Sequence, residues 1–479
     1  MLMKPDIIRP NIKNFIKSLR DMGYTFEIAL ADIIDNSLSA NADEISIYTS
    51  EDPKFIVTVL DNGYGMNQEQ LIESMRLGSK DPDIERSKED LGRFGLGLKT
   101  ASFSQCKKLT VITKQKSKIY ARQWDLDYLI NEDEWYLLTP HQAELEALPQ
   151  YELLKKLNSG TLVVWESIDT LESSSFTNTI YKLRDHLSLV FHRFIEGDAN
   201  KAKIKITVNN IPLDPFNPFN ENHKATQKPP LEKIKIENSF AFIQPYILPH
   251  HSKVSKQEYE KYATDEGYTK QQGFYLYRGG RLLIHGTWWG LNKINEAHKL
   301  VRIKIDIPNN QDHLWNIDVK KSTAAPNSFI KSHLKRILQN VLDKGSRVYT
   351  GRARPVNEVS SIPFWKVTLD SDHIHFLINK DHPLFELLKS SSTDSILLLN
   401  YIKSLEAFLP IPAIQSHLIN EPHKINQRTL MSENEIIDLA QKLRQMNLSE
   451  EHIQQILETE MFKNKRELLL YEPNSSKDL

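Results

Sequence analysis

Three short blocks decide the fold of this chain: ALADIIDNS at residues 29–37, LDNGYGM at 60–66 and LGRFGLGLKTAS at 91–102. Each block alone has an ordinary structural explanation, because a glycine-rich run can be a loop and an acidic helix face is usually solvated. Only their combination, in this order and at this spacing, is specific enough to indicate one particular kind of site.

The first block is predicted to be a helix. Its apolar residues recur at helical spacing, at Leu30, Ile33, Ile34 and Leu38. Asp32 and Asn36 are four residues apart and share a second face, with Asp35 close by. Mg²⁺ prefers oxygen ligands, so Asn36 is a candidate ligand, and Asp32 can orient or deprotonate a water. The alternative is a polar helix face without chemistry.

The second block follows an apolar run at residues 55–60 that predicts a buried strand. Asp61 closes this strand, where its carboxylate can accept a hydrogen bond from an exocyclic amine. Gly63 and Gly65 permit positive φ and a close approach of a ligand to the backbone. The alternative is an ordinary Asp-Asn-Gly turn.

The third block has Gly92, Gly95 and Gly97 before a helix-like run. Backbone N–H groups at a helix start bind phosphate through their free donors and the local dipole. Lys99 adds a point charge for a phosphate. The spacing matches neither the Walker loop nor the dinucleotide-binding fingerprint.

The three blocks resemble the N box, G1 box and G2 box of the GHKL ATPase superfamily, which includes gyrase, the ninety-kilodalton heat-shock chaperones, histidine kinases and MutL. The nearest likeness is to MORC ATPases and their bacterial relatives, and GTLVVW at 160–165 strengthens it. The resemblance implies ATP and Mg²⁺, with Asn36 as the Mg²⁺ ligand, Asp61 on the adenine amine and Thr161 supporting that contact. It implies a mobile lid at 78–93. The other residues that it places around the nucleotide are Gly63, Gly65, Met66, Gly92, Phe94, Gly95, Gly97, Leu98 and Lys99.

The sequence departs from the family at the general base. The usual Glu lies four residues before the Asn, and here that position is Asp32. Asp is one methylene shorter but keeps the carboxylate, so we interpret Asp32 as the base. Asp35 is the weaker candidate for that role.

Composition and net charge limit the classes of protein to which this chain can belong. Hydrophobic residues make up 40% and charged residues 26% of the 479 residues, and the net charge is −1, as in ordinary folded proteins. No global field draws the chain to DNA, so any DNA contact must be a local patch. Cys106 is the single cysteine, which excludes an internal disulfide and a multi-cysteine zinc site and fits a cytoplasmic protein. No signal peptide and no membrane-spanning run is expected.

The pattern of strands and helices predicts an α/β (α+β) fold. Strands are predicted at 45–48, 55–60, 109–113, 119–124 and 161–165, and helices at 10–22, 24–40, 140–159 and 178–196. They predict a GHKL-type sandwich in a domain at 1–200. Residues 222–232 are predicted to be a connector, and strands are predicted at 202–210, 240–247, 273–277, 281–285 and 300–307. The resemblance implies a ribosomal-S5-like transducer domain at 201–350. Residues 351–479 are predicted to be mixed, mainly helical and of unknown role.

The segment LWNIDVKKS at 314–322 is predicted to be a strand ending in two lysines. It resembles the GHKL segment that delivers a lysine to the terminal phosphate of ATP. By position Lys321 is that residue, and Lys320 would lie on the opposite strand face. Such a lysine would also stabilise charge in phosphoryl transfer. The alternative is a solvated lysine pair.

A basic stripe, defined as the basic residues of 328–354, follows on a predicted amphipathic helix. It consists of Lys331, Lys335, Arg336, Lys344, Arg347, Arg352 and Arg354. Such a stripe can track a phosphate backbone. The alternative, a solvated helix face, is favoured.

Together these features predict a cytoplasmic, Mg²⁺-dependent ATPase that forms an ATP-gated homodimer. The MORC likeness implies DNA, a nuclease or helicase partner, and a role in restriction or anti-phage defence. A MutL-type protein and a heat-shock-type chaperone stay open as alternatives. A different class is a nucleotide-switched binding module with little turnover, because Asp32 replaces Glu.

Overall fold

The structure is a computed structural model that describes residues 10–78, 97–197, 203–236, 239–264, 266–318, 320–321, 323–350, 362–370, 373–391, 395–411, 414, 432–446 and 448–470. In these ranges no helix has the length and apolar character needed to cross a membrane. The chain divides into two compact units, one of residues 1–253 with 257–349 and one of 254–256 with 350–479. The further division of the first unit at residue 200 stays a prediction.

The first sheet of the first unit positions the second block. Its strand order is β4-β3-β5-β2-β1-β6-β7, and all neighbours are antiparallel except β1 and β6. The strands are β1 (Glu44–Ser50), β2 (Ile56–Asp61), β3 (Cys106–Gln115), β4 (Lys118–Asp125), β5 (Gly160–Ile168), β6 (Lys205–Val208) and β7 (Ile211–Pro212). Asp61 ends β2 directly opposite Thr161 of β5. This register brings together two residues that lie 100 positions apart in sequence.

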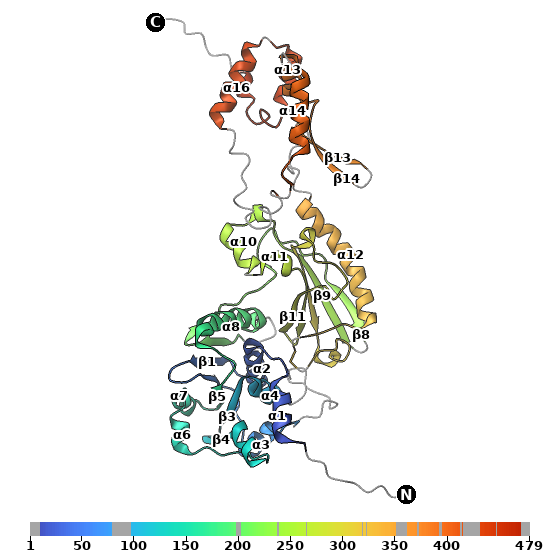
Figure 1. The fold of residues 1–479 in the computed structure, drawn as a ribbon. Helices are drawn as coiled ribbons and strands as arrows, with labels where there is room; N and C mark the ends of the chain where they lie inside the picture. Colours follow the sequence, from blue (N-terminus) through green and yellow to red (C-terminus); the bar gives the residue numbers. More distant parts are fainter. Residues whose placement is uncertain are drawn as a thin grey trace, which may run out of the picture. The chain divides into compact units, whose positions relative to one another are not determined.

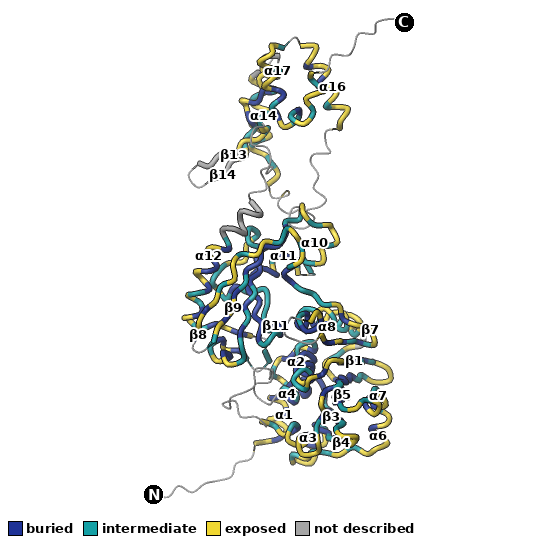
Figure 2. The backbone as a smooth tube through the Cα atoms, turned by 180° about the vertical axis from the view of Figure 1, so that it is seen from behind, coloured by how far each residue is buried: buried dark blue, intermediate teal, exposed yellow. Residues whose placement is uncertain are grey.

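Helices cover both faces of this sheet (Figure 1). They are α1 (Ile12–Arg20), α2 (Phe26–Ser39), α3 (Gln68–Met75), α4 (Gly97–Gln105), α5 (Leu126–Glu132), α6 (Gln142–Glu146), α7 (Tyr151–Lys156), α8 (Phe176–Val190) and α9 (His192–Glu196), with a 3-10 turn at Ser173–Ser175. The large core joins α1, α2, α4 and α8 to one face, and a smaller core joins α6 and α7 to the other. Leu30, Ile33 and Ile34 of α2 are fully buried, as their spacing predicts, and Figure 2 shows α2 as a largely buried helix.

The second sheet lies in the same unit, with strand order β11-β10-β12-β9-β8. Its elements are β8 (Glu232–Ile236), β9 (Ser239–Ile247), β10 (Gly273–Arg278), β11 (Arg281–Thr287), β12 (Val301–Ile307), α10 (Lys256–Ala263), α11 (Gly267–Lys270) and α12 (Ser328–Thr350), with 3-10 turns at His251–Lys253, Glu296–His298 and Asn309–Gln311. Ile330, Leu334 and Ile337 of α12 enter its core. Strand β8 was not predicted, although Ile234 and Ile236 alternate inward between exposed lysines.

The predicted strand at 314–322 is wrong. Residues 311–318 form turns and irregular backbone, and no described residue of the segment pairs in a sheet. Trp315 is fully buried in the second core, but its carbonyl accepts from the Ala325 amide at 2.8 Å. Apolar residues therefore anchor a loop that closes on itself, and the argument from strand alternation for Lys320 no longer holds.

The second unit contains the hairpin of β13 (Trp365–Asp370) and β14 (His373–Ile378), followed by helices. The helices are α13 (Pro383–Ser391), α14 (Ser395–Ala407), α16 (Glu433–Gln445), α17 (Glu450–Leu457) and α18 (Glu467–Leu470). The predicted fold class, an α/β sandwich followed by a mainly helical C-terminal region, is confirmed.

Candidate functional site

Helix α2 presents the polar residues of the first block. Thr25 caps its start by accepting from the Ile28 amide. Asp32 and Asp35 are buried at 2% and 1% exposure, whereas Asn36 is exposed. The Asn36 amide nitrogen donates to the Asp32 carbonyl at 3.0 Å, which leaves its side-chain oxygen as a candidate ligand for a hard cation.

Two cations from the second sheet region meet these carboxylates. Lys321 Nζ lies 3.1 Å from Asp32 Oδ1 and 2.6 Å from Asp35 Oδ2. Arg281, the first residue of β11, places Nε 2.8 Å from Asp35 Oδ1 and a terminal nitrogen 3.7 Å from Asp32 Oδ1. The site is thus a buried cluster of two carboxylates and two cations, and its members come from both halves of the first unit.

Burial dominates the electrostatics of this cluster. It raises the pKa of Asp32, and the nearby Lys321 and Arg281 oppose that rise. The Tyr24 hydroxyl donates to Asp32 Oδ2 at 3.1 Å, and burial raises the pKa of Tyr24 well above its ordinary value. Tyr24 therefore stays a neutral donor that holds one oxygen of Asp32 in place.

Lys321 reaches the cluster from the tip of a tight loop. Its amide donates to the Asp318 carbonyl at 3.1 Å, and the Asp318 amide donates to the Thr323 carbonyl at 3.2 Å. Lys321 adopts φ of 55°, which a non-glycine residue rarely adopts and which clusters at functional sites.

Asp61 forms the second part of the candidate site. It is 4% exposed and accepts from Ser37 Oγ at 2.9 Å, from the Gly63 amide at 2.9 Å and from the Thr161 amide at 3.2 Å. Burial raises its pKa against these three hydrogen bonds. A carboxylate has about four acceptor positions, so Asp61 keeps capacity for one further donor.

Nearby protein backbone leaves no room for a side chain at either glycine of the second block. A Cβ on Gly63 would meet the Ala40 carbonyl oxygen at 2.7 Å, and one on Gly65 would meet the Lys114 carbonyl oxygen at 2.1 Å. Gly65 also has φ of 63°. Met66 follows, half-buried, and its amide donates to Thr113 Oγ1 at 2.8 Å. The turn is therefore pinned against β3 beside Asp61.

The third block is described only in part. Gly92, Phe94 and Gly95, with most of the predicted lid at 78–93, lie outside the described residues. Gly97 opens α4, and a Cβ there would lie 3.8 Å from Asp32 Oδ2, so this helix start is next to the carboxylate. Leu98 packs on the large core. Lys99 is buried, and its ammonium donates to the Ser74 carbonyl at 2.8 Å; its phosphate role stays a prediction.

Sequence reasoning missed four contributors to this site: Tyr24, Ser37, Thr113 and Arg281. Ser37 lies inside the first block and could have been found as a hydroxyl on the same helix as Asp32. Arg281 follows a Gly-Gly turn, which indicates a hairpin but not its long-range partner.

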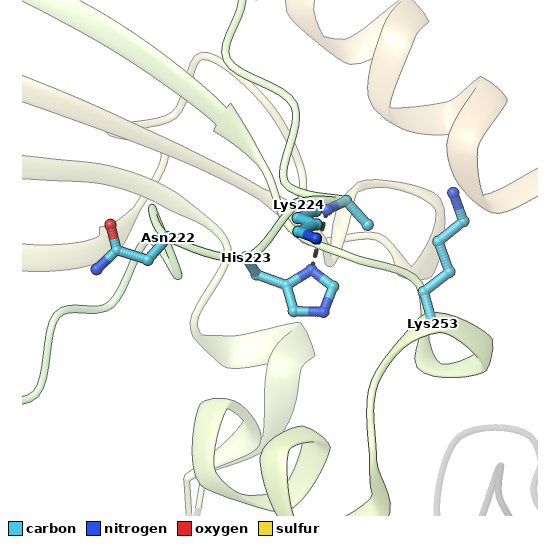
Figure 3. A pocket seen from close by; sticks show the side chains of 5 residues that line it. Asn222, His223, Lys224 and Lys253 are labelled. Carbon is cyan, nitrogen blue, oxygen red and sulfur yellow. Dashed lines mark hydrogen bonds between the residues drawn. The ribbon is translucent and has the colours of Figure 1, made fainter.

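A separate hollow of about 610 Å³ is lined by Asn222, His223, Lys224, Ala225 and Lys253 (Figure 3). His223 Nδ1 accepts from the Ala225 amide at 3.0 Å, so the imidazole is engaged in the loop itself. None of these residues belongs to the predicted site, and the described residues hold no group of three or more His, Cys, Asp or Glu that could bind a metal.

Comparison with known families gives one match. Residues 24–161 match the family described as Histidine kinase-, DNA gyrase B-, and HSP90-like ATPase. This range begins at Tyr24 and ends at Thr161, so it contains Asp32, Asn36 and Asp61. No relative of the chain is found among the curated proteins.

Proposed function

We propose, on the premise that residues 24–161 form a GHKL-type ATPase domain, that this chain is a cytoplasmic, Mg²⁺-dependent ATPase gated by Lys321. The observation that carries the proposal is the pair of contacts from Lys321 to Asp32 and Asp35, across 289 and 286 residues of sequence. In this structure Lys321 neutralises the two carboxylates. When ATP binds, it exchanges to the terminal phosphate.

The exchange gives each residue a chemical role. Asp61 accepts the adenine amine, with Thr161 supporting it. Asp32 accepts a proton from the water that attacks the terminal phosphorus, while the bond to ADP breaks. Lys321 balances the charge that develops on the transferred phosphoryl group. While Lys321 pairs with Asp32, its positive charge lowers the pKa of that carboxyl and makes it a weaker base.

Asn36 fits the Mg²⁺ that this chemistry needs. Its side chain is exposed, and its nitrogen is committed to the Asp32 carbonyl, so the oxygen is the group left to offer. Bound Mg²⁺ supplies positive charge that neutralises the phosphates. The residues Gly92 to Lys99 would surround those phosphates, with Gly97 at the start of α4 beside Asp32.

The biological setting rests on the resemblance to MORC-like ATPases. It supports an ATP-gated homodimer that acts as a clamp on DNA, with a nuclease or helicase partner in restriction or anti-phage defence. Of the basic stripe, the structure describes the side chains of Lys331, Lys335 and Arg336, and Arg336 pairs with Glu232 at 3.1 Å. Lys331 and Lys335 are therefore the stripe residues we propose for a phosphate backbone.

A second candidate is a nucleotide-switched or chaperone-like module with little turnover. The same cluster favours it, because a base neutralised by Lys321 and Arg281 could stay so after ATP binds. The two candidates differ in one measurable quantity, the rate of phosphate release by a chain that has bound ATP.

Phosphate release by the full-length chain tests the proposal. Turnover should require Mg²⁺ and stop with a chelator. Asp32→Asn should keep ATP affinity by calorimetry but lose roughly 10²–10⁴-fold in turnover, the usual contribution of a general base. Asp133→Asn, an exposed aspartate in the same domain, is the matched control. ATP binding without turnover in the wild type would favour the module, and loss on Asp35→Asn alone would move the base to Asp35.

A further inference from the structure

Arg281 is the member of the cluster that the mechanism above leaves without a role. It is 3% exposed at the first position of β11. Gly279 and Gly280 before it adopt φ of 56° and 90°, which turns the β10–β11 hairpin so that Arg281 pairs in register with Arg278. The side chain therefore leaves the hairpin at a fixed point of the sheet.

The guanidinium lies between Asp35 of α2 and Phe191, which follows α8. Its Nε lies 2.8 Å from Asp35 Oδ1, and its central carbon lies 5.7 Å from the centre of the Phe191 ring, a cation–π distance. The two atoms Nε and Oδ1 are close, yet neither completes a hydrogen bond of good geometry. Such unsatisfied buried atoms are rare in folded proteins, and a catalytic role is one explanation for them.

The charges in the cluster require a second cation. Asp32 and Asp35 are both buried, and a buried carboxylate without a partner is costly. Lys321 serves both carboxylates, so its departure to a phosphate would leave both without it. Arg281 lies 2.8 Å from Asp35 and 3.7 Å from Asp32, so its main partner is Asp35. It can keep Asp35 neutralised while Asp32 is released.

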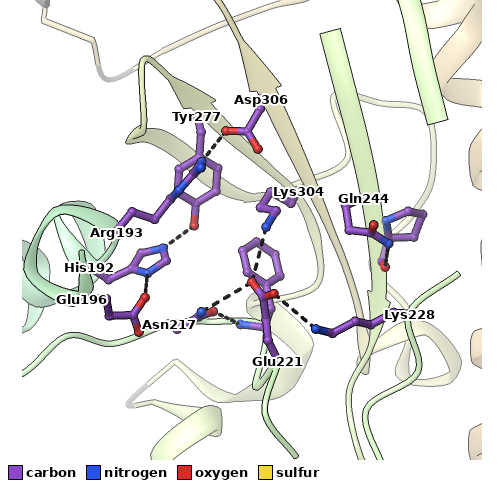
Figure 4. A network of polar contacts seen from close by, with 12 residues as sticks. His192, Arg193, Glu196, Asn217, Glu221, Lys228, Gln244, Tyr277, Lys304 and Asp306 are labelled. Carbon is purple, nitrogen blue, oxygen red and sulfur yellow. Dashed lines mark hydrogen bonds and ion pairs between the residues drawn. The ribbon is translucent and has the colours of Figure 1, made fainter. Parts of the chain in front are cut away.

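Polar contacts also join the second sheet to α9 (Figure 4). His192 Nε2 lies 2.8 Å from the Tyr277 hydroxyl, and Arg193 pairs with Asp306. Tyr277 belongs to β10, the other strand of the hairpin that carries Arg281, and Asp306 belongs to β12, the strand next to β10. These contacts hold the sheet that carries Arg281 against α9, and Lys321 takes no part in them.

We propose that Arg281 is a positioning residue of the ATPase reaction. It holds Asp35, and with it helix α2, in place relative to the second sheet while Lys321 moves to the nucleotide. The Asp32 carboxylate therefore stays oriented toward the attacking water. The planar fork of Arg suits a fixed contact, and the flexible ammonium of Lys suits the mobile one. This inference rests on the proposed ATPase function.

A stability cycle without nucleotide tests the pairing alone. In the full-length chain, Arg281→Met should lower the Tm, because Asp35 loses a buried partner. Adding Asp35→Asn should restore part of the loss, so the two effects should be non-additive. Adding Asp133→Asn to Arg281→Met should restore nothing. Strictly additive effects of Arg281→Met and Asp35→Asn would overturn the pairing.

Kinetics test the positioning role. Arg281→Met should lower kcat by roughly 10–100-fold, the scale of a small misplacement of catalytic groups. The KM for ATP should change less than about twofold, because Arg281 acts through Asp35. Arg281→Lys, which keeps the charge, should recover much of kcat and guards against a variant that fails to fold. If the wild type hydrolyses ATP and both variants keep full kcat, this inference fails alone. If the wild type has no turnover, the proposed function fails, while the stability cycle still reports the pairing.

Discussion

At the scale of single residues, Asp32 and Asp35 occupy different surroundings although both are buried on α2. Asp35 has both oxygens next to cations of the second sheet region, Lys321 and Arg281. Asp32 shares Lys321, but its Oδ2 accepts from Tyr24 and faces the start of α4 at Gly97. The oxygen nearest the predicted phosphate loop thus belongs to Asp32, which favours Asp32 as the base and Asp35 as the anchor.

Asp61 gives the first residue-scale prediction. In Asp61→Asn an NH₂ group replaces one carboxylate oxygen. That donor would then lie opposite another donor, because Ser37, Gly63 and Thr161 all donate to the Asp61 carboxylate. The variant would also lose an acceptor for the adenine amine. Each unmade buried hydrogen bond costs about 1–3 kcal/mol, so ATP affinity by calorimetry should fall roughly 10-fold or more. Asp133→Asn should bind like the wild type. Unchanged affinity in a folded Asp61→Asn chain would remove Asp61 from the adenine site.

At the scale of elements, much of the first sheet and its helices could be predicted because local patterns determine them. Helix α2 shows this well, since its apolar spacing, its cap at Thr25 and its buried face all agree. Strand β2 likewise ends at Asp61 as predicted. These features depend on residues a few positions apart, which a sequence shows directly.

The elements that could not be predicted depend on distant partners. The segment around Trp315 has the apolar residues of a strand, but its backbone carbonyls accept hydrogen bonds from the amides of Ala325 and Asn327 in the same loop. Strand β8 was not predicted, because it is only five residues long and a lysine separates its two isoleucines. Arg281 meets Asp35 through a long-range ion pair that no local pattern indicates.

The turn after β2 gives a prediction at this scale. Gly65→Ala should destabilise the protein by more than the roughly 1 kcal/mol expected for positive φ alone, because its Cβ would lie 2.1 Å from the Lys114 carbonyl oxygen. Gly78 is the matched control, with φ of 68° and nothing within 4 Å of an added Cβ. The two Tm values compare the effects directly. Equal losses would show that the turn is not pinned against β3.

At the scale of the first unit, polar contacts link the helices of the first sheet to the second sheet region. Lys321 and Arg281 meet α2, Arg193 meets Asp306, and His192 meets Tyr277, whereas the main apolar cores of the two sheets are separate. A ligand can change how the two parts linked by these contacts are arranged only if it binds one arrangement more tightly than the other. The terminal phosphate of ATP supplies that difference if it competes with Asp32 and Asp35 for Lys321.

The last prediction follows from this competition. Lys321→Ala should lower both ATP hydrolysis and the association of two chains that a non-hydrolysable ATP analogue induces, because the second sheet then has no contact with the phosphate. Light scattering with and without the analogue measures the association. Excess ATP should not rescue it, since the adenine site at Asp61 is unchanged and can already be filled.

Lys320→Ala is the control for this prediction. The Lys320 ammonium lies near Gly23, since a Cβ built on that glycine would be 3.6 Å from Nζ, and Lys321 is the neighbour that reaches both carboxylates. Lys320→Ala should therefore hydrolyse ATP and associate like the wild type. Lys321→Ala also leaves Asp32 and Asp35 with Arg281 alone, so its Tm without nucleotide must be measured to separate lost coupling from lost folding. A folded Lys321→Ala chain that hydrolyses and associates normally would show that Lys321 neutralises the cluster but does not sense ATP.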